Sequence, residues 1–226
     1  AHEAEDRAGG DPADALVWDE LISRTREDST LSVTFLMFLT LACLLAAVGV
    51  VTDSTVTVVG AMVVGPEFGP LAALSVAIVQ RRGALARRAA VALLAGFPVA
   101  MGITALLTLA AQAVGWVSLD TVKNVDDVDF IFQVGPLSFV VALLAGAAGM
   151  LSLMSSAPAA LVGAVISVTT VPAAGVAAVA GILGDGPVAA QSGIQLVVNL
   201  VGIVLAGVLV LVIRPRANLI PRAAQT

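Results

Sequence analysis

The order of apolar and polar positions is the most informative feature of the chain. Long apolar runs alternate with short polar or charged segments, and a run of about 20 apolar residues can cross the hydrocarbon core of a bilayer as a helix. Six such runs occur, at residues 31–51, 55–80, 89–115, 134–154, 157–183 and 188–213. The pattern predicts an all-α integral membrane protein with six transmembrane helices.

The segments between and beyond these spans carry most of the charge. Residues 1–12 are acidic and poor in large apolar side chains, which predicts a disordered tail. Residues 13–28 place apolar residues at near-helical spacing between charged ones, which favours an amphipathic juxtamembrane helix over disorder. Residues 81–88 predict a basic turn, residues 116–133 an external acidic loop, and residues 214–226 a basic cytoplasmic tail.

Basic residues fall almost entirely on one side of the predicted membrane. With six crossings, Lys123 alone lies on the side opposite the termini. Basic residues are enriched in cytoplasmic loops, so we predict a multi-pass protein of the cell membrane with both termini in the cytoplasm. The residues on the side of the termini are Arg7, Arg24, Arg26, Arg81, Arg82, Arg87, Arg88, Arg214, Arg216 and Arg222.

An internal repeat relates the two halves of the chain. A shift of 103 residues sets TVVGAMV, at residues 57–63, against ALVGAVI, at residues 160–166, and brings the first three spans onto the last three. Because each set holds an odd number of crossings, the second set would be inverted, as in many secondary transporters. We predict two inverted three-helix repeats, residues 29–115 and 134–213; chance similarity of Gly- and Ala-rich segments is the alternative.

Gly and Pro interrupt the second and fifth spans near their middles. The second span contains Gly65, Pro66, Gly69 and Pro70, and the fifth contains Pro172, onto which the shift places Gly69. Proline removes a backbone donor and clashes with the preceding turn, so we expect helices 2 and 5 to be broken at mid-span. Either the freed helix ends form a midplane site for an ion or polar solute, or the kinks serve close packing only.

The stretch DSTVTVVGAMVVGPEFGPL, at residues 53–71, resembles the hallmark of the domain of unknown function 389 family, which reads approximately V-I-G-A-M-L-I-A-P-L-M-G-P. Gly65 replaces the usual Ala, and Glu67 stands where the family has an apolar residue, so no role for Glu67 is inherited. The resemblance implies a six-span fold over residues 30–213 and a transporter-like role without an assigned substrate. The matching positions are Gly60, Ala61, Met62, Pro66, Gly69 and Pro70.

Glu67 is the first candidate for a functional side chain. It is the only carboxylate predicted deep within a span, where a charge is usually paired, protonated or exposed to a watered cavity. Two interpretations are open: a proton- or cation-linked role, and a protonated, hydrogen-bonded side chain that only caps the broken helix after Gly65 and Pro66. Gln195 and Asn199 share a helix face and either line a pathway or bridge helices by hydrogen bonds. The predicted substrate-binding set is Gly65, Pro66, Glu67, Gly69, Pro70, Thr169, Thr170, Pro172, Gln195 and Asn199.

Two further candidate sites lie outside the spans. The acidic loop offers oxygen ligands for a divalent cation, but its spacing lacks the Gly and terminal Glu of an EF-hand, so a solvated loop is the alternative. The basic turn is a candidate for anionic lipid headgroups, although its effect on topology is a sufficient role. The residues concerned are Asp126, Asp127 and Asp129 in the loop and Arg81, Arg82, Arg87 and Arg88 in the turn.

Composition narrows the function classes. The chain is 59% hydrophobic and 12% charged, which excludes an ordinary soluble domain. Its net charge of -5 comes largely from the acidic tail and the acidic loop and says little about the membrane part, and we expect no nucleic-acid partner. Cys43 and His2 are the only residues of their types, so disulfides, Cys- or His-based metal sites and His-based catalysis are excluded. We expect no enzyme and no cofactor, because no nucleophile–base–acid set or phosphate-binding loop occurs.

The leading hypothesis is a membrane transporter or channel-like protein for a small solute or ion, with its site between broken helices 2 and 5. Spans rich in small residues make a thin monomer, so we also expect a homo-oligomer. The alternative is a structural or scaffolding membrane protein whose helix breaks serve packing only.

Overall fold

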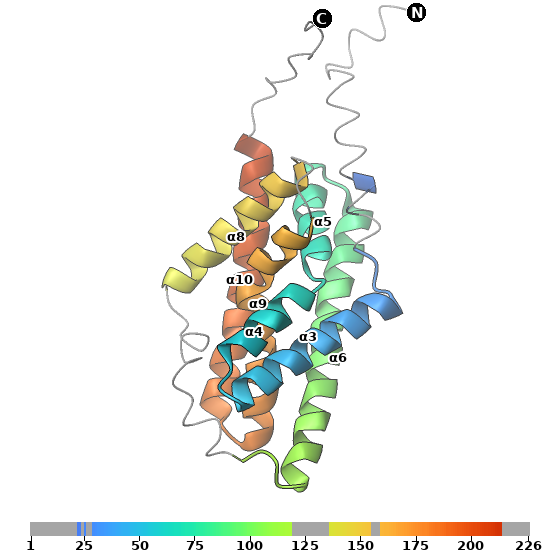
Figure 1. The fold of residues 1–226 in the computed structure, drawn as a ribbon. Helices are drawn as coiled ribbons and strands as arrows, with labels where there is room; N and C mark the ends of the chain where they lie inside the picture. Colours follow the sequence, from blue (N-terminus) through green and yellow to red (C-terminus); the bar gives the residue numbers. More distant parts are fainter. Residues whose placement is uncertain (1–21, 24, 26–28, 119–135, 155–158, 214–226) are drawn as a thin grey trace, which may run out of the picture.

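The computed structural model describes residues 22–23, 25, 29–118, 136–154 and 159–213 (Figure 1). Every regular element in this part of the chain is helical, which confirms the predicted all-α class. Almost all of the predicted tail, amphipathic helix, acidic loop and basic tail lie outside it. The helices are α3 (Val33–Val51), α4 (Thr55–Val64), α5 (Phe68–Val79), α6 (Gly83–Ala113), α8 (Pro136–Met154), α9 (Ala159–Leu183) and α10 (Gly186–Ile213).

The length and apolar character of these helices identify a membrane protein. By length and composition, α3, α6, α8 and α10 can each cross a membrane, and α4 with α5 meets the same test as a pair bent by 52°. The outward faces are apolar: Leu94 of α6, Leu137 of α8 and Leu209 of α10 each expose more than half of their surface. Soluble monomers rarely expose apolar surface on this scale. The chain is therefore a multi-pass membrane protein.

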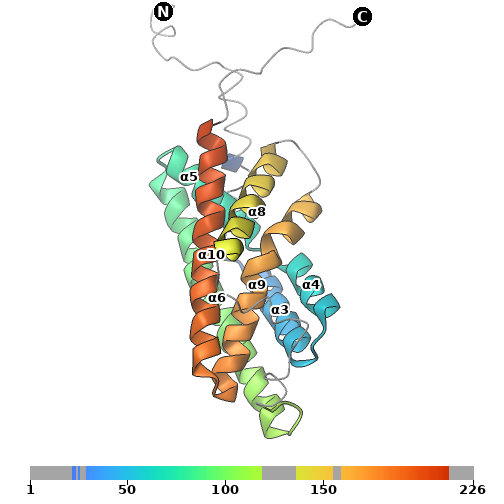
Figure 2. The ribbon, with the colours of Figure 1, turned by 90° about the vertical axis from the view of Figure 1, so that its left-hand side faces the viewer.

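Two long helices frame the molecule. In Figure 1, α6 and α10 run its length in opposite directions, and α5 packs against both. The hairpin of α3 and α4 lies against α9, as the turned view in Figure 2 also shows. Phe35 of α3, Leu71 of α5, Ala173 of α9 and Leu196 of α10 belong to one buried apolar cluster. The core is thus shared by helices from both ends of the sequence.

The turn before α6 is shorter than the sequence predicted. The predicted basic turn at residues 81–88 is wrong in extent, because α6 already begins at Gly83. The chain reverses at Arg81, whose φ of 53° lies in the left-handed region. Ala, Leu and Arg are strong helix formers, so four arginines do not by themselves end a helix.

Ser54 sets the start of α4. Its hydroxyl oxygen accepts a hydrogen bond from the backbone N–H of Thr57 at 3.3 Å, as an N-cap residue does. Asp53, the residue before it, has a φ of 48° and forms the tight turn after α3.

A spacing of 103 residues recurs in the backbone. Helices α3 and α8 are both 19 residues long, and α8 begins and ends 103 residues after α3 (33 to 136 and 51 to 154). Helix α10 begins 103 residues after α6 (83 to 186). The turns before α6 and α10 also share a positive φ and a hydrogen bond across five residues: Arg81 (53°) with Arg82 N–H to the Ala77 carbonyl, and Gly184 (88°) with Asp185 N–H to the Ala180 carbonyl.

Candidate functional site

The chain leaves the helical conformation between α4 and α5, at residues 65–67. Pro66 explains the interruption. A residue before proline avoids the helical region, and Gly65 accordingly has φ −61° and ψ 127°. Pro66 has no N–H, so the Met62 carbonyl cannot receive its helical hydrogen bond. Pro70 lies in the first turn of α5, where a backbone N–H has no intrahelical acceptor, so this second proline leaves α5 intact.

Glu67 lies inside this break and has no exposed surface. It precedes the first turn of α5, but its side chain makes no capping hydrogen bond to that helix, which contradicts the helix-capping alternative. Instead, Oε1 of Glu67 accepts a hydrogen bond of 2.6 Å from Oγ1 of Thr170 on α9, which is also fully buried. Cys43 of α3 lies within electrostatic range of this carboxylate. The break therefore holds a buried carboxylate–hydroxyl pair beside α3.

The predicted break in helix 5 is wrong. Helix α9 runs without interruption from Ala159 to Leu183, with Pro172 inside it. The counterpart of Pro66 under the 103-residue spacing is Thr169, whose backbone keeps its N–H. A proline in a helix interior kinks or breaks the helix, and at Pro172 the helix continues. Thr169 lies within α9 directly before Thr170, and only its backbone is described.

The other predicted residues of the break shape its backbone. Gly65, Pro66, Gly69 and Pro70 contribute no polar side-chain atom, and all four lie within two or three residues of Glu67. The polar side chain that this segment contributes to the predicted site is therefore that of Glu67, and Thr170 of α9 is its hydrogen-bond partner.

Gln195 and Asn199 of α10 belong to a second polar group, in which both contact Ser138 of α8. Nε2 of Gln195 donates a hydrogen bond of 3.1 Å to Oγ of Ser138, and Ser138 donates one of 3.4 Å to Oδ1 of Asn199. Gln195 and Asn199 are buried, and Ser138 is half-buried. These contacts join α10 to α8, which is the interhelical bridge that the sequence analysis gave as one of two roles for Gln195 and Asn199. We call Ser138, Ser192, Gln195 and Asn199 the polar face.

Sequence reasoning missed Ser138 and Ser192. Ser192 is fully buried, and its hydroxyl has no hydrogen-bond partner in the structure. The sequence could have indicated this residue, because Ser192, Gln195 and Asn199 are spaced at i, i+3 and i+7 and therefore share one helical face. Ser138 had no such signal, since it lies in the first turn of another helix and only packing brings it to α10.

The candidates outside the spans have different outcomes. Asp126, Asp127 and Asp129 lie outside the described residues. The four arginines predicted to hold anionic lipid are exposed at the turn before α6 and in its first two turns, where headgroup contact is sterically open. Within the described ranges, no group of three or more His, Cys, Asp or Glu side chains is placed to hold a metal ion. The exposed arginines are Arg81, Arg82, Arg87 and Arg88.

Comparison with known proteins identifies one relationship. The model of the family described as Domain of unknown function (DUF389) matches residues 62–205, which is more than half of the chain. The matched region begins in α4 and ends in α10, so it contains the α4–α5 break, Glu67, Thr170 and the polar face. No curated protein matches the chain. No solved structure matches it either.

Proposed function

The chain belongs to the domain of unknown function 389 family, and we propose that it is a membrane transporter or channel-like protein for a small solute or ion. The proposed binding site lies between the α4–α5 break and α9, around Glu67 and Thr170. The proposal assigns the chain no catalytic step and no cofactor.

The buried Glu67–Thr170 pair carries the proposal. An acidic side chain at the centre of a membrane helix costs about 3 kcal/mol on insertion scales, and such residues commonly mark ion or substrate pathways. A side chain that only filled space in the break would be apolar, because a buried polar group must be compensated. Full burial of Glu67 and its 2.6 Å hydrogen bond to a second helix therefore favour a binding role.

The proposal includes six crossings arranged as two inverted repeats, α3 to α6 and α8 to α10. The shared helix bounds and the matching turns before α6 and α10 support this arrangement. Glu67 and Thr170 are themselves 103 residues apart. When a two-fold axis relates two repeats, a residue contacts its own counterpart only at that axis. The pair would then lie at the centre of the repeats, where transporters of this architecture bind their substrates.

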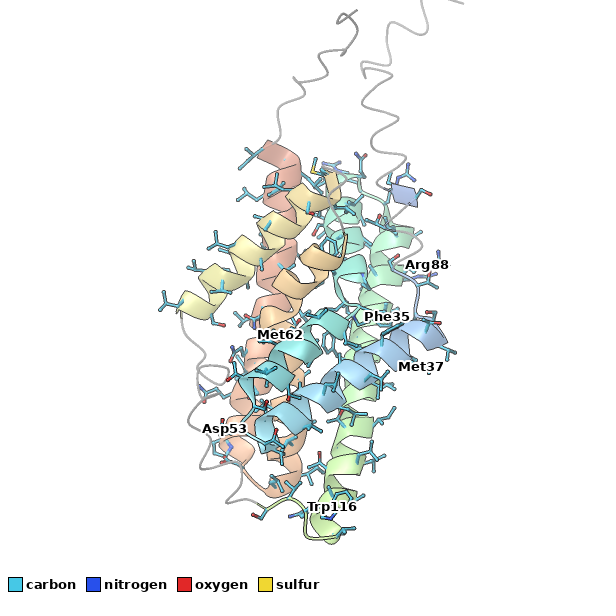
Figure 3. The ribbon with its side chains drawn as sticks, viewed as in Figure 1. Phe35, Met37, Asp53, Met62, Arg88 and Trp116 are labelled. Carbon is cyan, nitrogen blue, oxygen red and sulfur yellow. The ribbon has the colours of Figure 1, made fainter. Side chains whose placement is uncertain are left out.

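We propose a cell-membrane protein with both termini in the cytoplasm. Figure 3 shows Arg88 toward one end of the molecule and Asp53 and Trp116 toward the other. This separation supports a cytoplasmic position for the basic turn, because arginines are enriched on that side and Trp at the interfaces. A homo-oligomer is supported by Gly60, where an added Cβ would meet no atom within 4 Å. Such an exposed glycine allows a second copy to approach closely.

A flux screen in proteoliposomes tests the proposal. Small ions and polar solutes are presented to vesicles that contain wild-type protein, Glu67→Gln or Asp185→Asn. We expect at least one solute to cross faster than in empty vesicles, and Glu67→Gln to slow it by more than about tenfold because a neutral amide replaces the buried carboxylate. Asp185 accepts a hydrogen bond from the Val188 N–H at the start of α10, and Asn caps equally well, so its flux should persist.

Two outcomes count against the proposal. Folded wild-type protein that moves none of the solutes faster than empty vesicles supports the scaffold alternative. Equal flux through wild type and Glu67→Gln keeps transport but removes the site from the α4–α5 break.

A further inference from the structure

Glu67 and Thr170 both offer oxygen atoms as ligands for a cation. The carboxylate of Glu67 and the hydroxyl of Thr170 meet at 2.6 Å, a distance typical of a hydroxyl donating to a charged carboxylate. A few residues before Glu67 in the chain, the end of α4 leaves carbonyls without helical partners, because Pro66 has no N–H for Met62. The carboxyl end of a helix also carries a partial negative charge. Carboxylate, hydroxyl and carbonyl oxygens suit hard cations rather than anions or soft metals.

The single negative charge of the pair favours a monovalent over a divalent cation. Glu67 and Thr170 together carry one formal negative charge. The other acidic residues in the described part of the chain, Asp53 and Asp185, lie in the turns after α3 and after α9. No cluster of three or more potential metal-binding side chains occurs in that part. A monovalent cation neutralises a single carboxylate, whereas a divalent cation would leave a net positive charge in a low-dielectric site, at high cost.

We propose that the Glu67–Thr170 pair binds one monovalent cation per protomer, either a proton or an alkali metal ion. This inference rests on the proposed function and names the class of its cargo or coupling ion. The Thr170 hydroxyl holds the carboxylate in place, and displacement of that hydrogen bond opens a coordination position. Cys43 is a titratable side chain within electrostatic range of Glu67, so it must be controlled for in any proton measurement.

The 103-residue relation of the pair provides a sharp test. If Glu67 and Thr170 are counterparts at a two-fold axis, exchanging them preserves one carboxylate and one hydroxyl at the same place. The variants are Glu67→Thr, which removes the charge, and the double exchange Glu67→Thr with Thr170→Glu, which restores it from α9. Glu67→Gln serves as a second, near-isosteric removal of the charge in case Glu67→Thr does not fold. Cys43→Ala controls for the neighbouring thiol.

Each variant is assayed in proteoliposomes with radioactive sodium or rubidium and, in parallel, with a pH-sensitive dye in the lumen. We expect wild type and Cys43→Ala to move one of these cations, and Glu67→Thr and Glu67→Gln to lose more than about tenfold of that rate. The double exchange should recover a substantial part of it. Alkali uptake without acidification identifies an alkali ion, and acidification alone identifies a proton.

A binding readout accompanies the flux. In detergent, the unfolding temperature is measured in sodium, rubidium or choline chloride over a range of pH, because a ligand that binds only the folded state raises that temperature. We expect a cation- or pH-dependent increase that both charge-removing variants lose and the double exchange regains. Flux of an uncharged solute that depends on Glu67, with no cation dependence, overturns the cation inference and leaves the transporter proposal standing. Absence of any flux or cation effect in folded wild type overturns both.

Discussion

The two halves of the molecule, α3 to α6 and α8 to α10, fill corresponding positions with different chemistry. In the first half, Phe35 of α3 packs on Gly96 of α6, where an added Cβ would lie 2.8 Å from the Phe35 ring (Figure 3). In the second half, the residues 103 positions later are Ser138 and Asn199, which a hydrogen bond of 3.4 Å joins. In the first half a large side chain of α3 contacts a glycine of α6, whereas in the second half a small side chain of α8 contacts a larger one of α10. The same helix contact is apolar in one half and polar in the other.

The difference extends along the helix. Ala89 and Ala92, buried on α6, correspond to Ser192 and Gln195, buried on α10. Interhelical hydrogen bonds in membrane proteins contribute about 0.6 kcal/mol on average, so a polar face gains little stability over a well-packed apolar one. The polar face instead gives the second half hydrogen-bonding groups that the first half lacks at the corresponding positions. Helices at corresponding positions of the two halves therefore differ in what they can bind.

The halves also differ in the continuity of their middle helices. Pro66 interrupts the first half between α4 and α5, whereas Thr169 stands at the corresponding position of the unbroken α9. The first half therefore brings a helix break to the Glu67–Thr170 contact, and the second half brings an intact helix against it. Substitutions at corresponding positions can test each of these differences.

The largest effect is expected for Thr169→Pro, which copies Pro66 into the second half. It removes the backbone N–H at position 169 and adds a second proline three residues before Pro172, so α9 should break. The expected loss is about 3 kcal/mol or more of unfolding free energy. The measurement is reversible unfolding in detergent titrated with a denaturing surfactant. Thr169→Ala keeps the N–H and should change stability by less than about 1 kcal/mol. Equal stability of the two variants would show that this N–H does not keep α9 continuous.

An intermediate effect is expected for Gly146→Ala, where α8 lies close to the backbone of α10. An added Cβ would lie 2.6 Å from the carbonyl oxygen and 2.7 Å from the Cα of Ile203, both backbone atoms that cannot rotate away. We expect a loss of about 1–3 kcal/mol, as for an overpacked core. In the first half, the positions that correspond to Gly146 and Ile203 are Cys43 and Ala100. Both pack in one apolar cluster, so the first half accommodates a side chain at the position of Gly146.

Gly102→Ala is the matched control for Gly146→Ala. An added Cβ at Gly102 meets no atom within 4 Å, so this variant should be neutral or more stable by up to about 1 kcal/mol through helix propensity. Both are measured by the same surfactant titration. A Gly146→Ala variant as stable as Gly102→Ala would mean that α8 and α10 separate easily.

The positions of the helices could be predicted from the sequence because apolar run length sets membrane helices. The predicted fourth span, residues 134–154, contains α8 with a difference of two residues at its start. The predicted second span covers α4 and α5, and its interruption falls at the first of the two Gly-Pro pairs, Gly65-Pro66, whereas Gly69 and Pro70 lie within α5. The start of α6 was misplaced because charge was read as a turn signal, although arginine continues a helix well.

Tertiary contacts set what the sequence could not predict. The sequence predicted a helix break at both Pro66 and Pro172. Helix α9 nevertheless continues through Pro172, and Thr169, which stands where the first half has Pro66, keeps its backbone N–H. Glu67 and Thr170 were both candidates, yet their contact depends on how α5 and α9 cross. Ser138 escaped notice because a lone serine in a first turn resembles any other until a second helix supplies its partners.

The smallest effect is expected within the polar face, from a double-mutant cycle of Ser138→Ala and Gln195→Leu. Gln195→Leu keeps side-chain volume nearly constant and removes both the 3.1 Å hydrogen bond to Ser138 and a buried Oε1 that has no hydrogen-bond partner. These two contributions of Gln195→Leu oppose each other, and the interhelical hydrogen bonds that Ser138→Ala removes contribute about 0.6 kcal/mol each on average. Each single change should therefore alter the unfolding free energy by about 1 kcal/mol or less. The coupling between the two should be about 0.6 kcal/mol, the average for interhelical hydrogen bonds in membranes. Zero coupling would mean that the α8–α10 contact rests on apolar packing, as its counterpart at Phe35 does, and the contrast between the halves would then concern binding capacity alone.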